Sequence, residues 1–284
     1  MGLSVQALDK STGVELNNDT TIHWDLSTPG LRCNRISGFK FCIFPGVGER
    51  QNEVLFFTHG VLMDGNDWIK NQSYQKLRKE FDSQNRGTPT VISISHGPVW
   101  VLTSKNSRPL SGLLDAWDEK FIEKIEKSFG IENPSRRMII GDSMGGHNAM
   151  KLFNKMPQIF DRLALLCPAQ LDFSPFGEWG SFSDHMSDID SVWPMLMAAV
   201  GLMASFYDEE MWAKESPFYF SRAFFDQSSR MQIVVTTNDM YGFTKSNRSW
   251  IEYAKEQGST IDFHVELGTH CVPKSMKMVA EFLK

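Results

Sequence analysis

Residues 141–145 read Gly-Asp-Ser-Met-Gly, a G-x-S-x-G pentapeptide with a single serine at its centre. A strand-favouring stretch, 137–140, precedes it, and a helix-favouring stretch, 146–153, follows it. A serine on such a sharp strand-to-helix turn is held outward, where its hydroxyl oxygen can attack a carbonyl carbon. The pentapeptide also occurs as a glycine-rich turn without chemistry, so the interpretation of Ser143 as a nucleophile depends on an acid and a histidine farther along the chain.

A serine hydroxyl is a weak nucleophile until a neighbouring imidazole removes its proton. Of the seven histidines, His270 is the best candidate, because it follows the last predicted strand and so lies at the carboxyl edge of the predicted sheet. His147, one turn into the helix after the serine, would only line the site, and His96 is a candidate substrate contact. The other histidines have simpler explanations as structural or surface residues, and these are His23, His59, His185 and His264.

The histidine needs a carboxylate that orients it, and the chain order Ser…Asp…His places that acid at the end of an intervening strand. Asp239 meets this condition, since it follows the apolar run 232–236 and precedes a turn-like segment. An aspartate in a turn is common without catalysis. Asp172, after the preceding strand, is the alternative acid, and Asp184, Asp188 and Asp190 are weaker candidates.

The tetrahedral intermediate of acyl transfer needs two N–H donors aimed at its oxyanion. Met144, directly after the serine at a helix N-terminus, is expected to supply one donor. The loop after the apolar strand 54–58 is expected to supply the other, from the backbone N–H of Val61.

Apolar strands alternate with helical periodicity along most of the chain, which favours a mainly parallel sheet covered on both faces. The predicted strands are 20–26, 40–44, 54–58, 91–95, 137–140, 163–167, 232–236 and 261–266. The predicted helices are 74–81, 113–129, 146–153, 247–257 and 274–283. We therefore expect a single α/β domain over residues 1–284.

About sixty residues after the sixth predicted strand break this alternation, and a structureless loop of that length is rare in a compact domain. We expect residues 171–216 to form a helical insertion that acts as a cap or pocket wall, with the apolar segment 193–204 as a buried helix or lid. Extra core packing is the competing interpretation. With His96, the candidate substrate contacts are Trp100, Trp179 and Trp193.

Composition excludes several other classes of protein. The 284 residues carry 41% hydrophobic and 22% charged side chains and a net charge of −5, which is typical of a globular chain. Basic residues are scattered, whereas nucleic-acid binding requires a clustered cationic face. The first ten residues lack the pattern of a signal peptide, and no stretch has the length of a membrane span, so we expect a cytoplasmic protein.

The four cysteines show no metal-ligand spacing. Cys167 lies in an apolar strand and is expected to be a buried thiol. Cys33 and Cys42 could pair across a hairpin, although a reduced protein is the default expectation for this compartment.

Several motifs together resemble the α/β-hydrolase superfamily. They are Thr58-His59-Gly60, Gly141-Asp142-Ser143-Met144-Gly145-Gly146, Pro157-Gln158-Ile159-Phe160-Asp161, Glu215-Ser216-Pro217, Asp239 and Gly268-Thr269-His270. More narrowly, the chain resembles the esterase D type, which includes S-formylglutathione hydrolases, feruloyl esterases and mycolyltransferases. The resemblance spans roughly residues 54–284. It implies a serine esterase that uses Ser143, Asp239 and His270 without a metal or an organic cofactor.

The leading hypothesis is hydrolysis of a small carboxylic ester, with an apolar or aromatic acyl group, through an acyl-serine intermediate. Thioester hydrolysis and acyl transfer use the same triad, and the sequence does not separate them. A non-catalytic binding protein of this fold would be expected to have a damaged triad. The sequence leaves the oligomeric state open.

Overall fold

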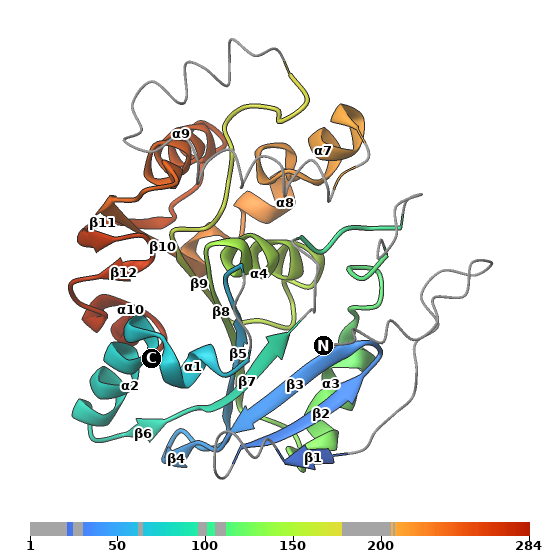
Figure 1. Cartoon of the computed structure of the whole chain (residues 1–284), viewed down its shortest axis with the longest axis vertical. Coiled ribbons are helices and arrows are strands. Elements are labelled where there is room, and N and C mark those ends of the chain that lie inside the picture. The colour runs from blue at the N-terminus through green and yellow to red at the C-terminus, as the bar shows by residue number, and fades with distance from the viewer. Residues whose placement is uncertain are drawn as a thin grey trace, which may run out of the picture.

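The computed structural model describes residues 22–24, 31–61, 65–95, 101–105, 112–177, 206 and 208–284. Within this part of the chain a mainly parallel sheet runs through the molecule, with helices on both of its faces (Figure 1). Its strands are β1 (Ile22–Trp24), β2 (Arg32–Ile36), β3 (Phe39–Phe44), β5 (Glu53–Thr58), β7 (Thr90–Ser95), β8 (Arg136–Asp142), β9 (Arg162–Leu166), β10 (Met231–Asn238), β11 (Asp262–Thr269) and β12 (Val272–Pro273). The expected α/β architecture is confirmed.

The strands lie in the order β1-β2-β3-β7-β5-β8-β9-β10-β11-β12. Every pairing from β7 to β11 is parallel, while β1, β2, β3 and β12 pair antiparallel at the two edges. A small separate pair joins β4 (Val47–Gly48) to β6 (Gly87–Thr88). Parallel strands all end at the same edge of a sheet, so the residues that follow β5, β8, β9, β10 and β11 gather there.

The two faces of the sheet have separate apolar cores. One core packs against α1 (Asp67–Lys70), α2 (Gln72–Ser83) and α10 (Lys277–Phe282). The other packs against α3 (Glu119–Ser128), α4 (Met144–Lys155), α8 (Arg222–Phe225) and α9 (Phe243–Glu256). Both faces of the central strands are buried, which explains why β5 reads as a continuous apolar run over 54–57. In β7 the serines at 93 and 95 alternate with isoleucines and are buried as well.

The structure shortens two predicted helices, 113–129 and 274–283, and adds several short elements. The helix predicted over 113–129 begins at Glu119, because the Asp118 side chain accepts the Phe121 N–H and caps a later start. Leu114 and Trp117, in the turn before the helix, are still buried in the core. The apolar spacing therefore predicted correctly which residues are buried, but it did not predict where the helix begins. The elements without a sequence prediction are β2, β4, β6, β12, α1, α8 and the 3₁₀ turns Pro217–Tyr219 and Ser228–Arg230, while α7 (Glu209–Glu215) lies within the predicted helical insertion 171–216.

The cysteines differ from expectation. Cys33 and Cys42 are directly paired in the β2–β3 register and form a disulfide, which was the less favoured alternative. The prediction that Cys167 is a free, buried thiol is wrong, since Cys167 and Cys271 form a second disulfide. The two residues lie 104 positions apart, and only the parallel order of β9, β10 and β11 brings them together.

The insertion predicted after the sixth strand is described only at its two ends, and α7 forms at the second of them. The apolar segment 193–204 lies outside the described residues, so the cap and the domain boundaries stay predictions. Lys151 of α4 forms a buried ion pair with Glu215 at the end of α7, and Glu215 Oε1 also accepts the Ser104 N–H at 2.9 Å. Among the helices that the structure describes, none is long and apolar enough to cross a membrane.

Candidate active site

Ser143 lies on a sharp turn between β8 and α4, with φ 52° and ψ −121°. A non-glycine residue rarely adopts a positive φ, so the surroundings must hold this backbone in place. The Ser143 N–H donates to the Leu166 carbonyl at 2.9 Å, and the Ser143 carbonyl accepts the Ala169 N–H at 2.8 Å. A Cβ at Gly145 would lie 2.5 Å from the His59 carbonyl oxygen, so the turn tolerates only glycine there.

Three polar side chains meet at the carboxyl edge of the sheet. His270 Nε2 lies 3.1 Å from Ser143 Oγ, and His270 Nδ1 lies 2.9 Å from Asp239 Oδ1. The Asp239 side chain is only 1% exposed and that of His270 is 17% exposed. With Nδ1–H donated to the carboxylate, the lone pair on Nε2 faces the serine hydroxyl.

The sheet register explains why the acid and the imidazole meet. In the β10–β11 ladder Asn238 pairs with Thr269, so the residues that follow, Asp239 and His270, leave the sheet side by side. A register shift lies between Thr236 and Asn238, just before this point. The distant parts of the chain are therefore aligned by strand pairing rather than by a long flexible loop.

Two aromatic rings pack against the imidazole of His270, and the sequence analysis did not identify them as site residues. The Tyr241 ring centroid lies 4.4 Å from that of His270, and the Phe243 centroid lies 5.8 Å from it. The Tyr241 N–H also donates to Asp239 Oδ1 at 2.9 Å, so that oxygen accepts two hydrogen bonds. The only available signal was an aromatic pair two and four positions after the candidate acid.

A second buried carboxylate lies beside the serine. Tyr74 O–H donates to Asp142 Oδ1 at 2.9 Å. Burial raises the pKa of Asp142 to about 6, although the hydrogen bond from Tyr74 and the charge of His270 both act to lower it. Burial and the nearby carboxylate raise the pKa of Tyr74 well above its usual value. Asp142 is the second residue of the pentapeptide, a variable position of the motif, so the sequence gave no signal for this pair.

Of the two residues predicted as oxyanion donors, one directly follows the serine and the other follows β5. Met144 is the first residue of α4, and Val61 is a half-buried residue in the loop after β5. Thr58 Oγ1 at the end of β5 donates to the Gly145 carbonyl at 2.7 Å, which holds this loop against the serine turn. Their roles toward an oxyanion belong to the proposal below.

The remaining candidates lie elsewhere or have other partners. Asp172, the alternative acid, accepts hydrogen bonds from Ser246 at 3.1 Å and Ser249 at 2.9 Å, which tie it to α9. His147 Nδ1 lies 2.9 Å from the Ala169 carbonyl, and burial lowers the pKa of His147 to about 3. The candidates outside the described residues are His96, Trp100, Trp179, Trp193, His185, Asp184, Asp188 and Asp190.

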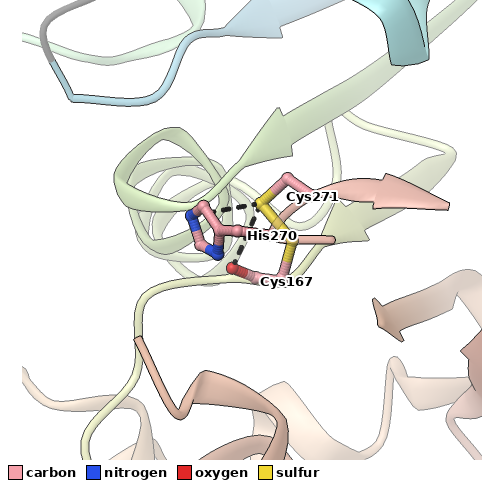
Figure 2. A group of neighbouring side chains, drawn as sticks. All are labelled: Cys167, His270 and Cys271. Atoms are coloured by element: carbon pink, nitrogen blue, oxygen red, sulfur yellow. Dashed lines mark hydrogen bonds between the residues drawn. A yellow bond between two sulfur atoms is a disulfide. The ribbon is translucent and has the colours of Figure 1, made fainter. Parts of the chain in front are cut away.

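Cys167, His270 and Cys271 form a compact group whose potential ligand atoms all lie within 4.8 Å of one another (Figure 2). Metals bind the thiolate form of cysteine. Because the two sulfurs are joined to each other, the group offers no thiolate in this state.

Comparison with known proteins identifies the family. Residues 105–272 match the family model described as "Esterase: Putative esterase", which covers more than half of the 284-residue chain. The chain belongs to this esterase family, and it is a carboxylic ester hydrolase. The search of curated proteins found no match.

Solved structures support the fold. A ferulic acid esterase is similar with a TM-score of 0.57 at 14% identity, covering 87% of this chain and 93% of that one. Carboxyl esterase 2 of Tuber melanosporum is similar with a TM-score of 0.59 at 13% identity, covering 98% of this chain and 87% of that one. A substrate-bound, fluorophosphonate-binding serine hydrolase of Staphylococcus aureus is similar with a TM-score of 0.58 at 12% identity, covering 93% of this chain and 96% of that one. The α/β-hydrolase fold expected from the sequence is thereby confirmed.

Proposed function

We propose that this chain cleaves carboxylic esters through a covalent acyl-serine intermediate, with Ser143 as nucleophile, His270 as general base and Asp239 as the orienting acid. The observation that carries the proposal is the continuous series of contacts from Asp239 Oδ1 through both ring nitrogens of His270 to Ser143 Oγ, at 2.9 and 3.1 Å. Both distances are within hydrogen-bond reach, which is the geometric requirement for a nucleophile and its base.

In the first half-reaction His270 Nε2 takes the proton of Ser143 as Oγ attacks the ester carbonyl. Asp239 stabilises the resulting imidazolium without taking its proton. The N–H groups of Met144 and Val61 are assigned to the oxyanion. The imidazolium then protonates the leaving alcohol, and a water molecule activated by the same imidazole releases the acid in the second half-reaction.

An apolar cluster beside the site supports an apolar or aromatic acyl group as the substrate class. Its buried members are Val101, Ala169, Leu171, Phe173, Phe206, Trp212 and Phe243, with Phe176, Met211, Ala213 and Tyr241 packed against them. Tyr241 and Phe243 belong to this cluster and also contact His270, so it borders the reacting atoms. A ferulic acid esterase among the structural relatives agrees with an aromatic acyl group.

The test is a panel of chromogenic esters of increasing acyl length, with one aromatic acyl member, assayed with the wild-type chain and Ser143→Ala. Ser83→Ala, an exposed serine at the end of α2, is the matched control. We expect turnover to disappear in Ser143→Ala and to persist in Ser83→Ala, with a preference for long or aromatic acyl groups. Undiminished turnover by a folded Ser143→Ala protein would refute the mechanism.

Two further substrates separate the related reactions. A thioester matched in its acyl group and an added alcohol acceptor test thioester hydrolysis and acyl transfer, which require the same triad. We expect the oxygen ester in water to give the highest kcat/KM. A higher value for the thioester, or quantitative transfer to the alcohol, would reassign the physiological reaction while leaving the triad in place.

A further inference from the structure

The Cys167–Cys271 disulfide lies at the reacting atoms. Cys271 directly follows His270, and its Sγ lies 3.6 Å from His270 Nε2 (Figure 2). The same nitrogen faces Ser143 Oγ. Cys167 directly follows β9, and Asp142 pairs with Leu166 in the β8–β9 ladder, so Cys167 and Ser143 leave the sheet as neighbours. Both cysteines are buried. The disulfide therefore joins the histidine loop to the strand beside the nucleophile.

The second disulfide has a different position. Cys33 and Cys42 are opposed within the β2–β3 hairpin, and β7, β5 and β8 separate that hairpin from β9. It contacts none of the three triad residues described above. The chain therefore contains one disulfide at the site and one remote from it, and the remote one serves as an internal control.

We propose that Cys167 and Cys271 are a redox modification site that switches His270 between a free base and a protonated, inactive form. The proposal rests on the function assigned to His270 above. In the disulfide, the Cys271 sulfur carries no proton. Reduction by a dithiol transfers two electrons and two protons, breaks the S–S bond to give two thiols, and leaves the reductant as a disulfide. The freed Cys271 thiol then adjoins Nε2.

The surroundings of the imidazole favour transfer of that thiol proton to Nε2. Asp239 contacts Nδ1, and Asp142 on β8 lies close enough for its charge to interact with that of His270. The Asp239 carboxylate is thus in place as a counter-charge, and the other described groups against the ring are the Ser143 hydroxyl and the rings of Tyr241 and Phe243. Thiolate–imidazolium pairs form in such settings because each charge stabilises the other.

A protonated Nε2 has no lone pair with which to accept the Ser143 proton. Reduction is therefore expected to stop catalysis at its first step, and reoxidation is expected to restore it. The oxidised chain is the active form. No change in the sheet is required, because one proton moves between two neighbouring side chains.

The experiment compares ester turnover of the oxidised wild-type chain before and after treatment with a dithiol, and again after reoxidation. We expect reduction to lower kcat/KM about tenfold or more, which corresponds to an ion pair favoured by about one pKa unit over the neutral pair. The reduced protein should show the ultraviolet absorbance of a thiolate at neutral pH, and His270→Ala should abolish that absorbance. Unchanged turnover after complete reduction of Cys167–Cys271 would overturn the proposal.

Variants separate proton capture from simple loosening of the loop. Cys167→Ser retains a free Cys271 thiol and should match the reduced wild type under all conditions. Cys271→Ser and Cys271→Ala lack that thiol and should not respond to the dithiol. If both Cys271 variants fold but are as inactive as the reduced wild type, the disulfide acts only as a tether and the proposal is wrong.

Cys33→Ser/Cys42→Ser is the matched control, and it should respond to the dithiol as the wild type does. Loss of the response in this variant would place the redox effect at the hairpin and contradict the proposal. Failure of the proposed function is distinguishable, because it would appear as absence of ester turnover in the oxidised wild type itself.

Discussion

Asp239 and Asp172 are two carboxylates near the same edge of the sheet with different partners. Asp239 Oδ1 accepts from Tyr241 N–H and contacts His270, and its Oδ2 has no hydrogen-bond partner among the described residues. Asp172 is instead bound by two serine hydroxyls of α9. Since one carboxylate contacts the imidazole and the other contacts two hydroxyls of α9, substitution of the two should affect different properties.

The first prediction concerns these two acids. Asp239→Asn should lower kcat by up to about 10⁴, because an amide favours the wrong imidazole tautomer. Asp172→Asn, the matched control, should leave kcat close to that of the wild type and change only stability. Steady-state kinetics on one chromogenic ester provide the measurement. Near-normal turnover in Asp239→Asn together with a large loss in Asp172→Asn would move the acid to Asp172.

The second prediction concerns Asp142 and pH. Its pKa is raised to about 6 in the folded chain from an ordinary 3.8, so the folded state binds the proton more tightly than the unfolded state. The stability that Asp142 contributes is therefore fully present below pH 3.8 and is lost as pH rises through about 6.

Asp142→Asn removes this titration while leaving an oxygen that can accept the Tyr74 hydroxyl. The stability of the variant relative to the wild type should therefore rise between about pH 4 and pH 7, by at most about 3 kcal/mol. Urea unfolding of both proteins across this range provides the measurement. A stability difference that is flat with pH, or that falls, would show that Asp142 is not held in this way.

Pairing between strands determines where the reactive side chains lie. Asp239 and His270 are adjacent because Asn238 pairs with Thr269, and Ser143 neighbours Cys167 because Asp142 pairs with Leu166. The helices contribute through their ends and their buried contacts. The Lys151–Glu215 ion pair is one such contact, with side chains 2% and 5% exposed, and it joins α4 to α7.

The third prediction tests this contact between elements. Glu215→Gln should lower the free energy of unfolding by about 3–5 kcal/mol, because it leaves the Lys151 ammonium buried without its counter-charge. Lys151→Met/Glu215→Gln should recover part of the loss, since no unpaired charge remains. The exposed pair Glu123–Lys127 is the control, and Glu123→Gln should cost at most about 1 kcal/mol. Equal losses for the buried and exposed pairs would contradict the account.

Sequence periodicity predicted the central elements because their burial is complete. β5 and β7 are buried at every position, and the apolar run 54–57 and the β-branched residues of 91–94 identified them. The first residue of α3 was less predictable, because the helix begins after its N-cap Asp118 and the apolar spacing continues unchanged across that position. The edge strand β2 has a mixed burial pattern and carries a weaker signal.

The candidate site was predictable where a motif or chain order specified it, and less so where only the fold brings residues together. Ser143, Asp239 and His270 each follow a strand, which the sequence pattern could indicate. The Cys167–Cys271 contact depends on two strand ends separated by β10, and no local pattern encodes it. The same holds for the Tyr74–Asp142 hydrogen bond, which joins α2 to β8.

In the described part of the molecule, helices cover both faces of the sheet (Figure 1), an apolar core lies on each face, and several parallel strands end at the edge that carries Ser143, Asp239 and His270. The cores explain the rigidity that a strained serine turn requires, and the edge collects the groups that react. This division follows from the parallel order of β7 to β11.

The central claim is that Ser143 becomes covalently acylated. The most direct measurement is peptide mapping by mass spectrometry after the oxidised chain has reacted with a fluorophosphonate, with Ser143→Ala and Ser83→Ala treated alongside. The account predicts a single stoichiometric adduct on Ser143 in the wild type and in Ser83→Ala, and no adduct in Ser143→Ala. An adduct on another residue, or labelling that persists in a folded Ser143→Ala protein, would contradict it.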